Sequence, residues 1–132
     1  MRCSHCGLCC TETEMLLSET DVERLIKTGF EEKHFVRRDK KGYLRLRNRR
    51  RYCIFYDARL RRCRVYRFRP EGCRLYPVIY SVEDGVIVDD LCLVKDTISR
   101  DELKLKGRKV VKLLARIDLE ATKHMTSVLA PP

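Results

Sequence analysis

The sequence predicts an α+β fold, a small domain of short strands and turns with one long C-terminal helix. The chain has 132 residues, which is enough for one modest core. Between residues 35 and 88, β-branched and aromatic stretches alternate with turn sequences that contain Gly or Asp, as in antiparallel hairpins. After residue 99, apolar residues recur at three- and four-residue steps, the period of a helix. We therefore expect residues 1–132 to form a single domain.

The first half of the chain is expected to hold a short helix and a hairpin. Residues 18–29 predict the helix, because Ser18 and Asp21 have the spacing of a capping box and a glycine ends the segment. Residues 35–47 predict the hairpin, with the turn sequence DKKG at its centre and alternating apolar and basic residues on its second strand. Residues 53–56 predict a third strand.

The middle of the chain is expected to be irregular and then to form a second hairpin. Pro70 is compatible with a helix only in its first turn, and it pushes Arg69 towards an extended conformation. Residues 63–76 are therefore expected to form two short turns rather than one helix. Residues 78–82 and 86–88 flank the turn sequence EDG, which predicts the second hairpin.

The C-terminal helix is the strongest of these predictions. Ser99 and Glu102 have capping-box spacing, so the helix should cover about residues 100–125. Its opposite face alternates Lys and Arg with acids, as solvated helix faces usually do. The expected buried stripe is Leu103, Val110, Leu114, Ile117, Ala121 and Met125.

The composition predicts a cytoplasmic protein without membrane contact. No uninterrupted apolar run reaches about 18 residues, and cysteines stand where a secretory signal would carry its apolar stretch. The chain has no Gln, a single Asn and 36% charged residues, which is typical of proteins from hot environments. Eight cysteines in a cytoplasmic chain indicate metal or redox chemistry, although intracellular hyperthermophile proteins leave a disulfide framework open.

The cysteines predict a metal centre. The first four have the spacing C-x2-C-x2-C-C, and two-residue spacers let successive thiolates turn towards one metal. The other four are spread over the middle of the chain. We expect all eight to be metal ligands: Cys3, Cys6, Cys9, Cys10, Cys53, Cys63, Cys73 and Cys92.

The spacing favours an iron–sulfur cluster, of the 4Fe–4S type, and leaves zinc open. Three cysteines at two-residue spacing with a distant fourth commonly hold such a cluster, whereas a zinc ribbon more usually has a second C-x2-C pair. Thiolates also bind Zn(II) readily. Eight thiols fit two four-ligand centres, or one centre with a separate redox pair. Adjacent Cys9 and Cys10 point in different directions in most backbone conformations, which lets them serve different centres.

The net charge of +10 is concentrated between residues 37 and 74, where sixteen Lys or Arg oppose three acids. A centre of four thiolates carries a charge of about −2, which nearby cations stabilise. We therefore expect Arg64, Arg69 and Arg74 to bind the cofactor. The basic segment also predicts a nucleic-acid or protein partner, with arginines between residues 45 and 62 on phosphates and tyrosines such as Tyr43, Tyr52 and Tyr56 stacking.

Two stretches match a known pattern of cysteines: CSHCGLCC at residues 3–10 and CRVYRFRPEGCRLYP at residues 63–77. With Cys53 between them and Cys92 after them, they resemble the CxxCxxCC cysteine-cluster family, described as zinc- or iron-chelating proteins. The family pattern is CxxCGxCC followed by C-x-I-Y-x-x-R-P-x-x-C-R-x-[FY]-P. One departure is Val65, where the pattern has Ile.

The resemblance spans about residues 3–94 and implies a metal-chelating domain there. One relative is a flagellin lysine methylase. The sequence has no G-x-G-x-x-G loop and only six glycines, so an ordinary nucleotide-fold site for a methyl donor has no place in it. No carboxylate pair or Ser-His-Asp order indicates catalysis. We expect a non-enzymatic metal-chelating protein in redox or maturation chemistry, and its catalytic residues, if it has any, are unknown. An Arg-rich nucleic-acid-binding metal module and a methylase-related enzyme are the alternatives.

Overall fold

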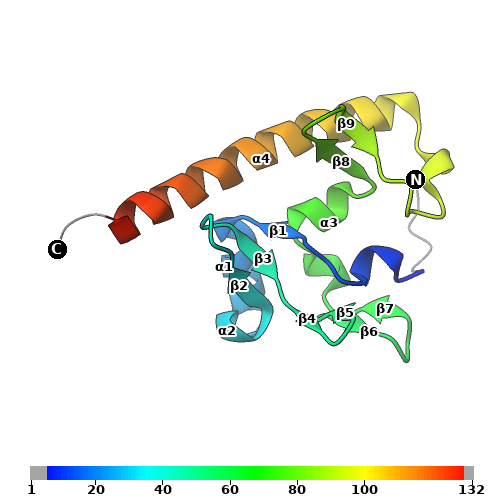
Figure 1. Cartoon of the computed structure of the whole chain (residues 1–132). Coiled ribbons are helices and arrows are strands. Elements are labelled where there is room, and N and C mark those ends of the chain that lie inside the picture. Colours follow the sequence, from blue (N-terminus) through cyan, green and yellow to red (C-terminus); the bar gives the residue numbers. More distant parts are fainter. Residues whose placement is uncertain (1–5, 130–132) are drawn as a thin grey trace.

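The computed structural model describes residues 6–129 and confirms the α+β fold (Figure 1). The helices are α1 (Glu19–Lys27), α2 (Glu32–Phe35), α3 (Glu71–Leu75) and α4 (Arg100–Leu129), and 3-10 turns cover Leu8–Cys10, Tyr66–Phe68 and Lys95–Thr97. The strands are β1 (Leu16–Leu17), β2 (Val36–Arg38), β3 (Leu44–Leu46), β4 (Asn48–Arg49), β5 (Tyr52–Cys53), β6 (Tyr56–Asp57), β7 (Arg62–Cys63), β8 (Val78–Ser81) and β9 (Gly85–Val88). The long α4 crosses one side of the molecule, and β4 to β7 lie on the side away from it.

The strand pairs of the described residues are all antiparallel and short. A three-stranded sheet has the order β1-β3-β2, and β4–β5, β6–β7 and β8–β9 are separate two-stranded ladders. Both expected hairpins are confirmed: Val36 pairs with Leu46 in β2–β3, and Val78 pairs with Val88 in β8–β9. Such short ladders bury too little surface to be stable alone. Packing between the elements must therefore hold the fold together.

Two segments differ from the sequence prediction. Phe35 ends α2 instead of beginning a strand. Residues 53–56 do not form one strand, because β5 ends and β6 begins within them. The break is possible because the N–H of Ile54 donates to the carbonyl of Arg47 at 2.9 Å, so the turn finds hydrogen-bond partners outside its own segment. The expected irregular stretch at residues 63–76 is confirmed as a 3-10 turn followed by α3.

A buried carboxylate joins α1 to the start of α3. The capping box expected at Ser18 forms, with the Ser18 hydroxyl and the Asp21 carboxylate each accepting the other's backbone N–H at 3.1 Å. The other oxygen of Asp21 accepts from the Arg24 guanidinium at 2.7 Å and from the N–H of Glu71 at 3.0 Å. Arg24 also donates to the carbonyl of Arg69 at 2.9 Å. Asp21, only 1% exposed, thus fixes the position of the segment before α3.

The described residues form two hydrophobic clusters. The first core cluster lies between α1, the three-stranded sheet and the turns that carry the middle cysteines: Leu17, Val22, Leu25, Phe35, Val36, Leu44, Leu46, Cys53, Phe55 and Val65. Cys10, Cys63 and Cys73 pack against it. The second core cluster joins α3, β8 and α4 through Leu75, Val78, Val110, Leu113 and Ile117. Burial of these side chains is the main favourable term in holding the short elements together.

The helix α4 is confirmed and runs to Leu129, four residues beyond the expected end. The Ser99 hydroxyl accepts the N–H of Glu102 at 3.0 Å, as the capping prediction requires. The buried face is Gly107, Val110, Leu113, Ile117 and Ala121. Leu113 is therefore buried in place of the expected Leu114, which is half-buried together with Leu103 and Met125.

Polar contacts fix α4 against the rest of the molecule. The Tyr43 hydroxyl donates to Asp118 at 2.5 Å, and the carboxylate of Glu120 accepts the N–H of Glu19 at the start of α1 at 3.0 Å. A carboxylate at this end of a helix is favourable because the helix dipole is positive there. Of the helices in residues 6–129, none combines the length and the apolar character needed to cross a membrane.

We predict that Asp21→Asn destabilises the fold by about 3 kcal/mol, because an amide puts a donor where the carboxylate accepts backbone and guanidinium hydrogens in a buried position. Urea unfolding measures the change. Glu23→Gln is the matched control, since Glu23 lies exposed in the same helix, and surface changes of this kind usually stay within about 0.5 kcal/mol. Equal unfolding midpoints for the two variants would show that the Asp21 network contributes nothing.

Candidate metal centre

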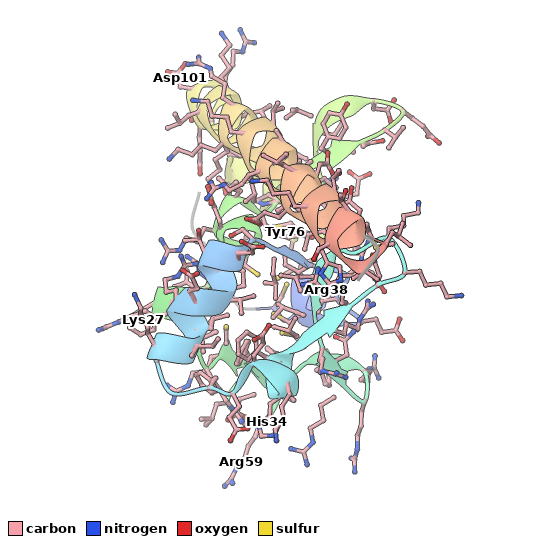
Figure 2. The ribbon with its side chains drawn as sticks, turned by 90° about the vertical axis from the view of Figure 1, so that its left-hand side faces the viewer. Lys27, His34, Arg38, Arg59, Tyr76 and Asp101 are labelled. Carbon is pink, nitrogen blue, oxygen red and sulfur yellow. The ribbon has the colours of Figure 1, made fainter. Side chains whose placement is uncertain are left out.

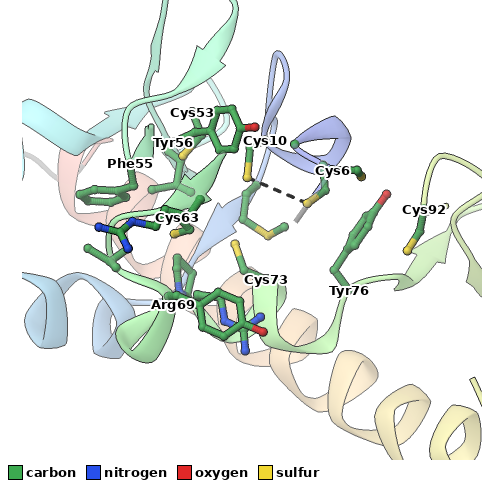
Figure 3. A pocket seen from close by; sticks show the side chains of 18 residues that line it. Cys6, Cys10, Cys53, Phe55, Tyr56, Cys63, Arg69, Cys73, Tyr76 and Cys92 are labelled. Carbon is green, nitrogen blue, oxygen red and sulfur yellow. Dashed lines mark hydrogen bonds between the residues drawn. The ribbon is translucent and has the colours of Figure 1, made fainter. Parts of the chain in front are cut away.

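A single cavity brings the cysteines together. It has a volume of about 90 Å³ and is lined by all seven described cysteines: Cys6, Cys9, Cys10, Cys53, Cys63, Cys73 and Cys92 (Figure 3). We call it the cysteine cavity. Cys3 lies outside the described residues. The seven sulfurs are all free thiols, so the disulfide alternative finds no pair among them.

Five separate parts of the chain supply these thiols. Cys9 and Cys10 stand on the first 3-10 turn, Cys53 on β5, Cys63 on β7 and Cys73 on α3, while Cys92 follows β9. The N–H of Cys10 donates to the carbonyl of Gly7 at 3.1 Å, and that of Cys73 donates to Pro70 at 3.0 Å. These local turns set the direction of each thiol, but only the packing of the five parts brings the thiols to one place.

Gly7 lets the N-terminal turn approach the cavity wall. Its φ of 81° lies in the left-handed region that favours glycine. A Cβ atom at Gly7 would also overlap the Tyr56 hydroxyl and would lie 2.7 Å from the ring carbon that carries it. The glycine in the CxxCGxCC pattern is therefore required twice, once for backbone conformation and once for contact with Tyr56.

The Cys9 and Cys10 sulfurs are 4.0 Å apart, joined by the dashed line in Figure 3. This hydrogen bond is the main cause that lowers the pKa of Cys9 to about 7, and the charge of Arg69 lowers it further. The same bond, together with burial, raises the pKa of Cys10. The expectation that adjacent cysteines point apart was wrong here, because the tight 3-10 turn brings both sulfurs to the same side. Cys9 therefore ionises more readily than Cys10.

Cys53 and Cys73 hold their protons more firmly than Cys9. Burial raises the pKa of Cys53 to about 11 and raises the pKa of Cys73 well above its ordinary value. Like charges add to the effect, since Cys53, Cys63 and Cys9 each raise the pKa of Cys73. A metal cation that displaces these protons would remove both the desolvation penalty and the repulsion.

The structure separates the arginines that were expected to bind a cofactor. Arg69 lines the cysteine cavity, stacks its guanidinium 3.9 Å from the centre of the Tyr66 ring, and has a buried Nε without a hydrogen-bond partner. Arg74 is exposed, donates to the carbonyl of Arg67 and does not line the cavity. Arg64 is also exposed and lines a different hollow. Only Arg69 of the three is placed to donate into the cavity.

Besides Tyr66, sequence reasoning missed three polar residues that line the cavity: Arg62, Tyr56 and Tyr76. The Tyr76 hydroxyl donates to Asp89 at 2.7 Å, and in Figure 3 its ring lies between Cys73 and Cys92. Each of the three does have a signal in the sequence, since it lies within three residues of a cysteine.

The donor set of the cysteine cavity suits a soft metal or an iron–sulfur cluster. None of the described residues that line it is Asp, Glu or His, and thiolate ligands select zinc, Cu(I) and iron–sulfur clusters over hard cations. Thiolates at a Zn–S distance of about 2.3 Å in a tetrahedron lie about 3.8 Å apart, close to the Cys9–Cys10 separation. Within residues 6–129, however, no three His, Cys, Asp or Glu side chains converge as closely as a single ion requires. The thiols surround a space rather than a point.

The comparisons identify the family. The model of the family CxxCxxCC, described as "Putative zinc- or iron-chelating domain", matches residues 2–97. The chain therefore belongs to this family, and the resemblance noted from its cysteine pattern is confirmed. It is also similar to the uncharacterized protein MJ0661 of Methanocaldococcus jannaschii, with 35% identity over 89 residues, which are 63% of this chain and 47% of that protein. The chain thus spans about half the length of that relative. No solved structure matches.

We predict that Gly7→Ala lowers the amount of metal bound per chain, because the added methyl group forces the N-terminal turn away from Tyr56. Metal analysis of the purified variant measures this. Gly29→Ala is the matched control: Gly29 also has a positive φ, of 108°, but nothing lies within 4 Å of its would-be Cβ. Both variants should lose about 1–2 kcal/mol from backbone strain. If both also lose the same amount of metal, the contact with Tyr56 is irrelevant to binding.

Proposed function

We propose that this protein holds an iron–sulfur cluster, of the 4Fe–4S type, in the cysteine cavity, with zinc as the alternative occupant. One observation carries the proposal: seven thiols from five parts of the chain line one cavity without a competing carboxylate or imidazole among the described lining residues. The volume supports a cluster over a single ion, since about 90 Å³ corresponds to roughly three molecules of liquid water. When bound, such a cluster supplies one-electron transfer.

The proposed ligands come from all eight cysteines, in two groups. The inner group is Cys9, Cys10, Cys53, Cys63 and Cys73, whose charges act on one another's pKa. Mutual influence of this size requires proximity, so we assign four of these five to the cluster. Cys3, Cys6 and Cys92 form the outer group, which we assign to a second centre or to exchange of ligands at the rim. The free thiols also support a reducing, cytoplasmic location.

With a cluster held by these ligands, the proposed role of the protein is metal chelation that supports redox chemistry or the maturation of another protein. Neither an enzymatic reaction nor a flagellin lysine methylase activity gains support from any group in the cysteine cavity, because its described lining residues include no carboxylate or imidazole that would act as a general base. Arg69 supplies a cationic donor to the cavity, with a buried Nε that has no hydrogen-bond partner within the described residues. Hydrogen bonds to cluster sulfur and nearby positive charge both stabilise the centre and tune its potential.

Anaerobic purification tests the proposal. We expect brown protein that absorbs at roughly 400 nm and contains about four iron and four sulfide per chain. Cys73→Ser should lose most of the iron, whereas Cys92→Ser should retain at least half, because Cys92 belongs to the outer group. Colourless protein with stoichiometric zinc would establish the alternative. Protein without metal, with its sulfurs paired as disulfides, would refute chelation itself.

Arg69→Ala should lower cluster occupancy and shift the reduction potential downwards, because removing a cation next to a centre of net negative charge disfavours the more negative reduced state. Redox titration followed by the visible spectrum measures the potential. Arg74→Ala is the control, since Arg74 carries the same charge but lies exposed outside the cavity. Equal shifts in the two variants would mean that overall charge, and not the position of Arg69, sets the potential.

A further inference from the structure

The described residues contain a second hollow next to the cysteine cavity, with a volume of about 620 Å³. Cys53, Phe55 and Tyr56 line both spaces, so the segment from β5 to β6 is the wall between them. The volume lies within the range of about 300–1,000 Å³ that is usual for ligand sites. We call this hollow the arginine groove.

The arginine groove is strongly cationic. Arg49, Arg50, Arg51 and Arg64 line it, together with His34, and Asp57 is its only described carboxylate. Asp57 is already occupied, because its Oδ1 accepts the backbone N–H groups of Arg59 and Leu60 at 3.0 and 3.1 Å. His34 and Arg59 both point outward at the end of the molecule away from Asp101, the start of α4 (Figure 2). Apart from Asp57, none of the described residues that line the groove carries a negative charge at neutral pH.

The seven arginines between residues 49 and 64 form no ion pair within the described residues. Other arginines do: Arg37 pairs with Glu14 at 2.8 Å, and Arg45 pairs with Asp39 at 2.9 Å. The Nε of Arg47 is also engaged, donating to the carbonyl of Val36 at 2.8 Å. Internal ion pairing therefore does not account for the seven arginines between residues 49 and 64, which remain available to an external anion.

Two of these arginines occupy backbone positions that suit glycine or asparagine better. Arg50, in the two-residue turn between β4 and β5, has φ 59°, and Arg61, before β7, has φ 52°. Arginine at a left-handed position costs about 1 kcal/mol or more relative to glycine. Both side chains are exposed, and Arg50 lines the groove, whereas Arg61 does not.

Aromatic rings complete the groove. Phe30, Tyr52 and Tyr56 line it and are all half-buried, so part of each ring reaches its surface. The rings of Tyr52 and Tyr56 are 5.1 Å apart, and the Arg51 guanidinium lies 5.5 Å from the centre of the Tyr52 ring. Arginines that track phosphates beside rings that stack on bases are the usual means of binding single strands. Acidic peptides would use the arginines but not the rings.

We propose that the arginine groove binds single-stranded nucleic acid, with its arginines on the phosphates and its aromatic rings on the bases. The site goes beyond metal chelation, since its phosphate-binding residues do not line the cysteine cavity. The wall shared by the two spaces places a bound strand directly behind Cys53. A metal centre bound in the cysteine cavity would then keep the segment from β5 to β6 in the conformation that lines the arginine groove.

Fluorescence anisotropy with labelled single strands of about 12 nucleotides, one oligouridylate and one oligothymidylate, tests the proposal on the full chain purified anaerobically. We expect at least one strand to bind and its affinity to fall steeply with salt. Arg49→Ala/Arg50→Ala/Arg51→Ala should weaken binding roughly tenfold or more, and the slope of log affinity against log salt should decrease by about 0.7 for each phosphate that the variant no longer neutralises. The preferred strand distinguishes RNA from DNA.

The matched control is Arg108→Ala/Lys112→Ala/Lys123→Ala, which removes the same charge from exposed positions on α4 and should leave binding nearly unchanged. Tyr52→Leu should weaken binding roughly tenfold, while Tyr52→Phe should keep it, because stacking needs the ring and not the hydroxyl. Equal losses in the two triple variants, unchanged binding in the groove variant, or equally good competition by a duplex or by polyglutamate would each overturn the proposal.

Metal content measured on the same samples keeps this proposal separate from chelation. A groove variant that retains its metal and loses the nucleic acid supports the groove directly. Protein that binds the strand and contains no metal would refute the cluster and leave the groove standing. Protein that contains the cluster and binds no strand at low salt would refute the groove alone.

Discussion

Thiols buried in one cavity repel one another as soon as they ionise, and this constraint governs the rest of the molecule. Burial and like charge hold the proton on Cys73, while the hydrogen bond from Cys10 and the charge of Arg69 favour the thiolate at Cys9. Such an arrangement is poorly stabilised as a set of free thiols and well stabilised around a cation. The family to which the chain belongs, described as zinc- or iron-chelating, agrees with this physical expectation.

The scaffold around the cavity is built from elements too short to be stable alone, so a few polar contacts have large structural effects. Asp21 joins α1 to the start of α3, and Arg24 extends the connection to the carbonyl of Arg69. Arg69, which lines the cavity, thus has its backbone held by Arg24 and its guanidinium stacked on the Tyr66 ring. The long α4 contributes no lining residue to the cavity but supports α3, the element that carries Cys73.

The segment from β5 to β6 has two faces, and each face belongs to a different site. Cys53, Phe55 and Tyr56 close the cysteine cavity on one side, and on the other side they face Tyr52 and the arginines that form no ion pair within the described residues. A metal centre that fixes the positions of the thiols would therefore also fix the segment that forms the wall of the arginine groove. This coupling gives a physical reason for finding a concentrated positive charge next to a cluster of cysteines, beyond compensation of the charge on a metal centre.

The sequence by itself determined the features that depend on near neighbours: the capping box at Ser18, the cap at Ser99, the two hairpins, the period of α4 and the cysteine pattern. Tertiary structure alone decided that five parts of the chain bring their thiols to one cavity, that Arg69 lines it while Arg64 and Arg74 do not, and that residues 53–56 form a wall and not a strand. The reason is physical. Caps, turns and periodicity are set by interactions over a few residues, whereas the direction of a side chain in an irregular segment is set by packing against residues far away in the sequence, which spacing does not encode.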